Sequence, residues 1–530
     1  MNNFNSILGL TVGLFFMVSV TGCGAAAEST PVPPTATATV PSATPTITWT
    51  PAPSLTPTQT HTPTVTPTET LPPTATATPT ITPTPTDTPP PLPTPLPVSE
   101  IVYDNWQGVD LPPEVRDGID RPYIVFLNEN DSETVTSLAT AQPTTDRTVI
   151  YLGNPANPAD RIRLLELNTE ALESVFLAPA GNALAYFIEG TGPLSGLWAY
   201  DISLGISARV LVTDTLVKRG IFSPPSWSPD GRTLAVTLET GYNLDIFTFN
   251  LDQSRWVGLV RDDSFNFWPS WSPDGRYLAF VSDRADCPSW VPGTPNACDP
   301  DTTPTPISGH VYVMNIETGV ISQVSPERTF EPPYWVTEDT LAFSSGDPFD
   351  IINAERRLWL GSVPDMTARR IDLQDDPALT LYIGEAWAPD ASQVVFQSAG
   401  DENVIIAMSA EGERLATLDQ VTFARFSFRG DWMPDGTRLG VGGTGGQCPY
   451  GIRVFDDTPR LIASGTSPNN VCDPIYARNG QYMAYTAVNN ARSLDGRRDI
   501  YIASPEGFSP TNMTIDLRGQ MTLLGWVGPE

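Results

Sequence analysis

A repeated motif constrains this chain of 530 residues more than any other feature of its sequence. The segment 226–236, SWSPDGRTLAV, recurs as 270–280, SWSPDGRYLAF, and the two tryptophans are 44 residues apart. Pro-Asp-Gly favours a tight turn and an apolar, β-rich run follows it, so each copy predicts a hairpin. Such a fixed period predicts a fold built from repeated units. Degenerate copies surround Leu177, Trp335, Trp387, Trp432 and Tyr476, and a truncated copy begins at Trp526.

Each repeat also contains further strand-like runs after the hairpin. Segments 244–249, 310–314 and 499–502 are candidate third strands, and 414–418 is a candidate fourth strand. Four short strands in a period of 44 to 52 residues, with one period stretched to 64, describe the blade of a β-propeller. The sequence therefore predicts an all-β fold.

The motif and its period resemble the WD40-like propeller repeats of the TolB family. The resemblance covers roughly residues 120–530 and implies the fold. It implies little about activity, because relatives of this architecture serve as protein-binding scaffolds and as substrate-gating domains of peptidases.

The two ends of the repeat region complement each other. Three strand-like runs, 123–127, 148–152 and 161–165, have no motif before them, whereas the last strand, 521–527, has no strands after it. We expect these four to share one composite blade whose inner strand comes from the C-terminus, which would remove exposed sheet edges. The favoured fold has seven complete four-stranded blades plus this composite blade; the alternative is a seven-bladed ring with one end peripheral.

The N-terminal segment predicts export. Residues 7–20 form an apolar run that is short for a membrane span and suited to a signal peptide. The following Val-Thr-Gly-Cys at 20–23 resembles the lipobox of bacterial lipoproteins, which implies that residues 1–22 are removed and that Cys23 is lipidated. Residues 1–6 contain no Lys or Arg, which departs from the usual signal peptide, so cleavage nearby by an ordinary signal peptidase is the alternative. The predicted location is extracytoplasmic, with the lipid on Cys23 as the membrane anchor.

A Pro/Thr-rich linker, 23–99, follows the signal peptide, and the propeller is assigned to 100–530. Between 29 and 97 the residues are mostly Pro, Thr, Ala, Ser and Val, a composition that cannot form a core. Frequent proline favours polyproline II, so a disordered, fully extended stalk would reach roughly 200 Å at ~3.1 Å per residue. It is either an O-glycosylated stalk or an unmodified spacer.

The composition argues against several classes of function. A net charge of −31 repels phosphate backbones, which excludes nucleic acid as the expected partner. The sequence contains two histidines, His61 and His310, and none of the common hydrolase, nucleotide-binding or zinc motifs. Segment 440–445 matches Gly-x-Gly-x-x-Gly but leads to Cys-Pro and not into a helix. We therefore assign no catalytic residue, cofactor or metal site, and we assign the motif aspartates to turns: Asp230, Asp274 and Asp435.

Four cysteines remain after Cys23, an even number that suits an exported protein. In a four-stranded blade, the connection after the second strand and the one before the first strand open on the same side. All four cysteines fall in such connections. The most local pairing joins Cys287 to Cys298 and Cys448 to Cys472, and each bridge would add on the order of 3 kcal/mol.

The cysteine-bearing side is therefore the candidate binding face. It also carries the long loops 347–356 and 489–498. Trp290, Phe349 and Tyr450 could stack on sugar or anchor a protein there, although each alone could equally cap a loop from inside. The function that we favour is a non-enzymatic module that binds a protein or an envelope polymer. The alternative is a propeller enzyme, a hydrolase or lyase acting on peptide or polysaccharide at an axial-channel site.

Overall fold

The structure is a computed structural model, and every regular element in its described residues is a β-strand. The all-β fold class is thus confirmed. Within the described ranges there is no helix with the length and apolar character of a membrane span. The predicted signal peptide, Cys23 and the Pro/Thr-rich linker lie outside these ranges. The described residues are 119–129, 147–168, 172–299, 302–346, 356–399, 404–418, 428–444, 448–449, 451–464, 470–488, 498–517 and 519–529.

Five sheets are antiparallel meanders in which four consecutive strands pair in chain order. The first strand of each ends at the first position of a motif copy, which is Leu177 in one copy and tryptophan in the other four, so the motif marks the end of the first strand. Their strands are β4 (Leu172–Leu177), β5 (Ala183–Ile188), β6 (Gly196–Asp201) and β7 (Ile206–Leu211); β10 (Ser226–Trp227), β11 (Thr233–Glu239), β12 (Leu244–Asn250) and β13 (Arg255–Val260); β14 (Asn266–Trp271), β15 (Tyr277–Ser282), β16 (His310–Asn315) and β17 (Ile321–Gln323); β18 (Tyr334–Trp335), β19 (Thr340–Ser345), β20 (Arg357–Ser362) and β21 (Thr367–Ile371); β22 (Thr380–Trp387), β23 (Gln393–Ala399), β24 (Ile405–Ser409) and β25 (Arg414–Thr417).

The next two meanders are joined into one eight-stranded sheet by a single parallel pair, Gly443 with Cys472. A small hairpin, β8 (Val217–Lys218) with β9 (Ile221–Phe222), lies in the connection between β7 and β10. Counting the two meanders separately gives the eight units that we favour, and the blade number stays a prediction. Their strands are β26 (Phe428–Trp432), β27 (Arg438–Gly443), β28 (Arg453–Asp456) and β29 (Leu461–Ser464); β30 (Asn470–Tyr476), β31 (Met483–Val488), β32 (Arg498–Ala503) and β33 (Thr511–Asn512).

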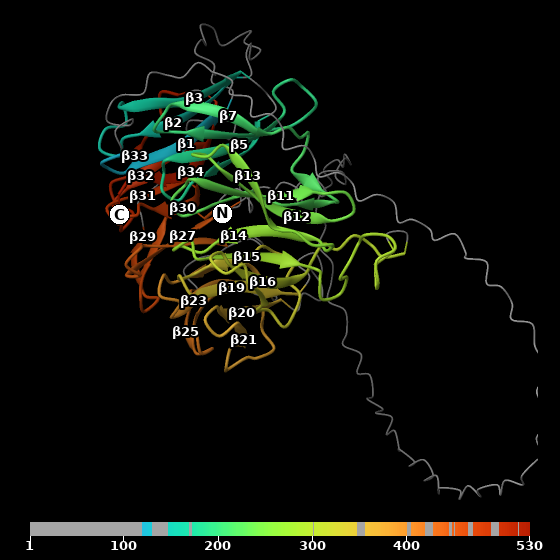
Figure 1. Cartoon of the computed structure of the whole chain (residues 1–530). Helices are drawn as coiled ribbons and strands as arrows, with labels where there is room; N and C mark the ends of the chain where they lie inside the picture. The colour runs from blue at the N-terminus through green and yellow to red at the C-terminus, as the bar shows by residue number, and fades with distance from the viewer. Residues whose placement is uncertain are drawn as a thin grey trace, which may run out of the picture. The chain divides into compact units, whose positions relative to one another are not determined.

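The composite sheet contains both ends of the described chain. It consists of β1 (Tyr123–Glu129), β2 (Arg147–Gly153), β3 (Arg161–Asn168) and β34 (Gln520–Val527), in the order β3-β2-β1-β34. The last strand pairs antiparallel with β1 over its whole length, from Tyr123 opposite Val527 to Glu129 opposite Gln520 (Figure 1). The C-terminal strand therefore completes a sheet that the N-terminal strands begin, as predicted.

Apolar clusters pack each sheet against the next one in the chain. Six clusters each join two successive meanders, from β4–β7 through to β30–β33. Two more clusters pack the composite sheet against both β30–β33 and β4–β7. The series of packed sheets thus returns to its start, which is the closure expected of a propeller.

The motif tryptophans add a hydrogen bond to this packing. The indole of Trp227 donates to the Phe176 carbonyl at 3.0 Å, and Phe176 is the residue before the aromatic position of the preceding copy. The same bond recurs from Trp335 to Ser270 (3.0 Å), from Trp432 to Ala386 (3.1 Å) and from Trp526 to Ile475 (3.1 Å). Buried indole N–H groups need such an acceptor. In these four copies the motif tryptophan therefore links neighbouring sheets as well as filling the core, whereas the Trp271 and Trp387 indoles make no such bond to a carbonyl.

The motif aspartates stabilise the turns in which they lie. The Asp230 carboxylate accepts the backbone N–H of Arg232 at 3.0 Å, and Asp274 does the same for Arg276. Asp435 accepts the backbone N–H of Thr437 at 2.9 Å. The glycine after each aspartate has positive φ, for example 66° at Gly231. Local turn chemistry thus accounts for these carboxylates.

The motif turn that follows Trp387 lacks the glycine and predicts a stabilising substitution. Ala391 stands at the glycine position with φ of 59°, which costs a residue with a Cβ about 1 kcal/mol. We expect Ala391→Gly to raise the melting temperature and to increase the free energy of unfolding by up to about 1 kcal/mol, measured in urea.

The next copy supplies the control. Gly436 has φ of 72°, and a Cβ added there would meet only Pro389, at 3.8 Å. Gly436→Ala should therefore lower stability through backbone strain alone. Equal stability of Ala391→Gly and the wild type would contradict the argument.

Closure by β34 predicts that a short C-terminal deletion unfolds the whole domain. Deleting 521–530 removes the β1 partner and the Trp526 link to Ile475, so we expect loss of cooperative thermal unfolding. Trp526→Phe keeps a ring and should cost about 1 kcal/mol through the lost hydrogen bond. Deleting only 529–530, beyond the strand, should change little. A 521–530 deletion that melts like the wild type would refute the closure.

Candidate functional site

Connections of very different length leave the two sides of the sheets. On the side of the motif turns they are short, such as 228–232 and 251–254. On the other side, the connections after the second strand include 283–309 and 346–356. We call this second side the long-loop side. Because loops on a rigid scaffold carry most binding sites, it is the candidate functional surface.

The structure pairs the four cysteines as the sequence predicts. The Cα atoms of Cys287 and Cys298 are 5.9 Å apart, and those of Cys448 and Cys472 are 5.3 Å apart. The first bridge closes a loop inside the connection 283–309. The second bridge joins the connection after β27 to β30 of the following meander. Both bridges belong to the long-loop side.

Trp290 packs the first disulfide loop onto the sheet and is not an exposed contact residue. Its side chain is only 4% exposed and stacks on Phe265, with ring centroids 4.7 Å apart. Its indole donates to the Asp283 carboxylate at 2.8 Å. The sequence left two roles open for Trp290, a contact residue for a ligand or a cap that packs the loop from inside. Its burial and its bond to Asp283 give it the role of the cap. Phe349, Tyr450 and most of the loops 347–356 and 489–498 lie outside the described residues.

The disulfide loop is held by backbone contacts as well. The Trp290 N–H donates to the Asp263 carbonyl at 2.7 Å, and the Ser264 hydroxyl donates to the Cys287 carbonyl at 3.2 Å. The same apolar cluster includes Ile221 of the β8–β9 hairpin and Leu244. Loop, hairpin and sheet are therefore one packed unit, which preorganises this part of the long-loop side.

A hydrogen-bonded network of charged side chains lies beside this loop. Arg284 donates to Asn266 and pairs with Asp262 at 2.9 Å, and its guanidinium lies over the Phe280 and Tyr312 rings at 5.2 and 4.7 Å. Because every one of these charged groups has a partner, the network holds the surface in shape. It supplies no free nucleophile or base.

A second polar cluster lies between β18–β21 and β22–β25, and the sequence did not predict it. The buried Arg356 donates to Glu331 and, at 2.8 Å, to the Ser344 hydroxyl, which itself donates to Glu331 at 2.9 Å. Glu385 on β22 lies near this pair. Burial raises the pKa of Glu385 to about 7, and the Glu331 carboxylate adds to the rise. The sequence contains one signal that could have revealed this cluster: Glu385 occupies the position where most other copies of the motif have proline.

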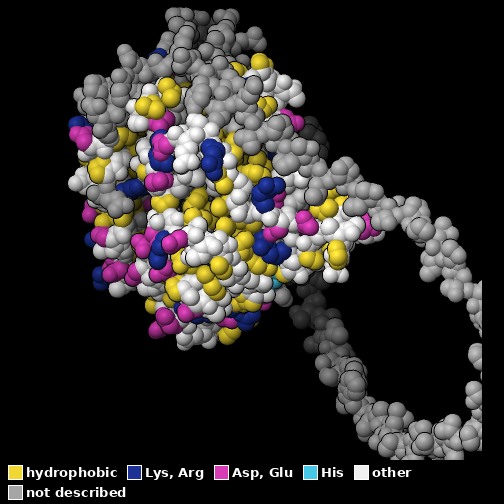
Figure 2. Space-filling view, in the orientation of Figure 1, with side chains coloured by type: hydrophobic (Ala, Val, Ile, Leu, Met, Phe, Trp, Pro, Cys, Tyr) yellow, Lys and Arg dark blue, Asp and Glu magenta, His cyan; other side chains and the backbone are white. Residues whose placement is uncertain are grey.

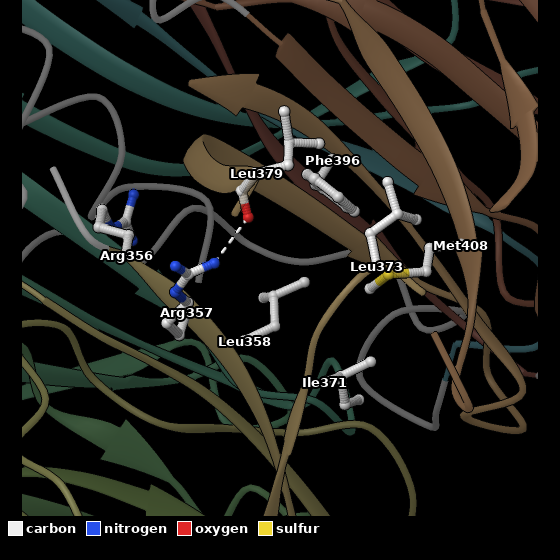
Figure 3. Close-up of a pocket in the computed structure, with 8 residues that line it drawn as sticks. All are labelled: Arg356, Arg357, Leu358, Ile371, Leu373, Leu379, Phe396 and Met408. Atoms are coloured by element: carbon white, nitrogen blue, oxygen red, sulfur yellow. Dashed lines mark hydrogen bonds between the residues drawn. The ribbon is translucent and has the colours of Figure 1, made fainter. Parts of the chain in front are cut away.

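A small pocket opens between the same two sheets (Figure 3). Its lining is mostly apolar, and the Arg357 guanidinium donates to the Leu379 carbonyl at 2.8 Å at one end. Its volume of about 10 Å³ suffices for about one water molecule. The pocket is too small for an organic ligand. Its lining residues are Arg356, Arg357, Leu358, Ile371, Leu373, Leu379, Phe396 and Met408.

The charged surface does not form a field of one sign on the face in Figure 2, where acidic and basic side chains are interspersed. Many are paired locally, such as Arg232 with Asp201 and Arg414 with Asp375, both at 2.7 Å. In the part of the chain that the structure describes, no group of three or more His, Cys, Asp or Glu residues is arranged to hold a metal ion. Recognition by this surface would depend on loop shape more than on long-range attraction.

The motif turns, the antiparallel meanders and their closed series of contacts define the domain as a β-propeller. Residues 165–292 match the family model for the TolB beta propeller domain. The resemblance predicted from the Trp-Ser-Pro-Asp-Gly motif is thus confirmed over these residues.

Solved structures similar to this chain include proteins of unrelated function. A dihydro-heme d1 dehydrogenase, NirN, is 11% identical, with 76% of this chain and 75% of that chain covered and a TM-score of 0.46. A eukaryotic initiation factor is 11% identical, with 75% and 97% covered and a TM-score of 0.46. An oligogalacturonate lyase in complex with manganese is 15% identical, with 73% and 97% covered and a TM-score of 0.39. Likenesses at this level carry no argument about function.

The buried carboxylates predict that stability falls as the pH rises. Burial raises the pKa of Asp245, Asp283 and Asp431 to about 6, and that of Glu385 to about 7. The folded state therefore binds these protons more tightly than the unfolded chain. The stability that they contribute is complete below about pH 4 and is lost as the pH rises through 6 to 7.

Glu385→Gln tests this directly. We expect its melting temperature to fall less between pH 5 and pH 8 than that of the wild type, by the equivalent of about 2 kcal/mol. The exposed Glu317→Gln removes the same charge and should leave the wild-type pH dependence in place. Parallel curves for Glu385→Gln and the wild type would contradict the prediction.

Proposed function

We propose that this protein is a lipid-anchored, extracytoplasmic binding module: a TolB-type propeller carried on an extended linker. Residues 20–23 supply the candidate lipidation sequence, and residues 23–99 supply the spacer. The two cysteine pairs at disulfide distance are consistent with an oxidising compartment. The domain itself would bind a protein or an envelope polymer.

The observation that carries this proposal is the contrast between the two sides of the sheets. The side of the motif turns has short connections, whereas the long-loop side has long connections that disulfides and the Trp290 contacts hold in place. Preordered loops lose less conformational entropy on binding, so a contact made there contributes more to affinity. Phe349 and Tyr450 remain the candidate contact residues.

Site-specific photo-crosslinking on intact cells tests the location of the binding face. A photoreactive amino acid at 349 or 450 should crosslink to an envelope component, whereas one at 508 should not. Phe508 is the matched control, because it is 44% exposed and lies in the connection 504–510 on the side of the motif turns. Crosslinking from 508 alone would contradict the proposed face.

Binding measurements then separate the two classes of partner. The full chain is applied to purified peptidoglycan sacculi and to a printed oligosaccharide array. If an envelope polymer is the partner, Phe349→Ala or Tyr450→Ala should weaken binding by about 30-fold, as loss of an aromatic anchor does, and Phe508→Ala should not. Crosslinks from 349 or 450 to protein, without sacculus or array binding, would indicate a protein partner.

The second candidate function, a propeller enzyme, has one observation in its favour. Glu385 and Tyr334 lie on first strands, β22 and β18, next to the Glu331–Arg356 pair. A carboxyl group with a pKa of about 7 can act as a general acid at neutral pH. Release of products from peptide or polysaccharide substrates by the wild type, abolished in Glu385→Gln, would support it. Equal release by both proteins would exclude Glu385 from that role.

A further inference from the structure

The contact between β18–β21 and β22–β25 contains two carboxyl groups and one guanidinium. Glu331 precedes β18, and Glu385 lies on β22. The guanidinium of Arg356, a residue only 2% exposed, donates to Glu331 and, at 2.8 Å, to the Ser344 hydroxyl. The positive charge of Arg356 is therefore matched by the carboxylate of Glu331.

Glu385 has no cation of its own among the groups that act most strongly on it. Its ionised form is favoured by Arg356, which is bound to Glu331, and by polar contacts with the neutral side chains of Tyr334 and Trp387. If both carboxyl groups ionised, the contact would bury one negative charge in excess, which is unfavourable. Burial accordingly raises the pKa of Glu385 to about 7. The proton in this contact therefore resides on Glu385.

The other charged groups on strands packed against β22 have partners elsewhere, and β23 has no titratable residue. They are Arg357 on β20, with the Leu379 carbonyl, and Arg429 and Asp431 on β26, with Asp473 and the Tyr476 N–H on β30. The charge balance of the contact thus depends on Glu331, Arg356 and Glu385.

This contact also lacks one of the bonds that join other sheets. The Trp387 indole donates to no carbonyl of the preceding sheet, whereas the indoles of Trp227 and Trp432 do. Strand β18 pairs with β19 at two positions only, and the small pocket lined by Arg356 lies between the same two sheets. Local separation here breaks fewer interactions than at a contact with the indole bond.

We propose that the contact between β18–β21 and β22–β25 is a pH-sensitive joint, which is closed while Glu385 carries a proton and opens locally when Glu385 ionises. Opening lets water solvate the ionised carboxylate, which the closed contact cannot do. The inference does not depend on the proposed binding face, because it concerns only the contact between two sheets.

Hydrogen–deuterium exchange of the full chain at pH 6 and pH 8 tests the proposal. After correction for the intrinsic exchange rate, the opening equilibrium of segments 334–345 and 380–399 should increase by about tenfold at pH 8. Segment 183–201, which covers β5 and β6, is the internal control and should change much less. An equal change in all three segments would overturn the proposal.

Two matched variants identify the group responsible. Glu385→Gln cannot ionise and should lose the increase in segments 334–345 and 380–399. Glu317→Gln removes an exposed carboxyl group from the turn between β16 and β17 and should keep it. An increase that persists in Glu385→Gln would overturn the proposal.

A titration of the wild type avoids any effect of the variants on folding. In the full chain labelled with ¹⁵N-tryptophan, the Trp387 indole shift should titrate with a midpoint near pH 7, and that of Trp227 should not. Glu331→Gln frees the charge of Arg356 for Glu385 and should move the Trp387 midpoint to lower pH. A Trp387 signal that does not titrate between pH 5 and pH 9 would overturn the proposal, as would a midpoint unchanged in Glu331→Gln.

Discussion

The contact between one sheet and the next is the interaction on which the rest of this structure depends. A single four-stranded meander has two apolar faces and cannot bury either alone, so it is stable only between two neighbours. In four copies the motif tryptophan stabilises this contact in two ways: its ring fills the space between the sheets, and its indole N–H donates to a backbone carbonyl of the preceding sheet. The repeat period follows from this geometry, because each copy must return its aromatic to the same place in the contact.

The sequence could predict the parts of the fold that depend on local chemistry. Pro-Asp-Gly marks a turn wherever it occurs, and N-terminal strands without a motif imply a partner from the C-terminus. The side-chain environments in the loops were not predictable in this way. Trp290 is buried because Phe265 and Asp283 happen to lie beneath it, and the Glu385 cluster joins residues of two different repeats. Such burial depends on contacts that form only in the folded protein, so no periodic pattern in the sequence predicts it.

The scaffold and the long loops are stabilised in part by different interactions. The turns, the indole bonds and the apolar clusters involve the strands and their short connections. The long connection 283–309 adds its own supports, a disulfide between Cys287 and Cys298 and the Arg284 network. Its residues Cys287 and Trp290 also belong to the apolar cluster that packs β14–β17 against β18–β21. Long connections on a rigid scaffold can vary in length and surface while the strands are kept.

The pairing of β1 with β34 also has a mechanical meaning. In a protein tethered through its N-terminal segment, as we propose, any pull from the membrane enters the folded domain at Tyr123, the first residue of β1. That strand is bonded on one edge to β2 and on the other to β34, and β34 is fastened to the preceding sheet through Trp526. The β1–β34 pair that closes the ring is therefore also the place where the tether joins the domain. A pulling force is shared by strands from both ends of the chain. Peeling β1 away would have to break two ladders at once.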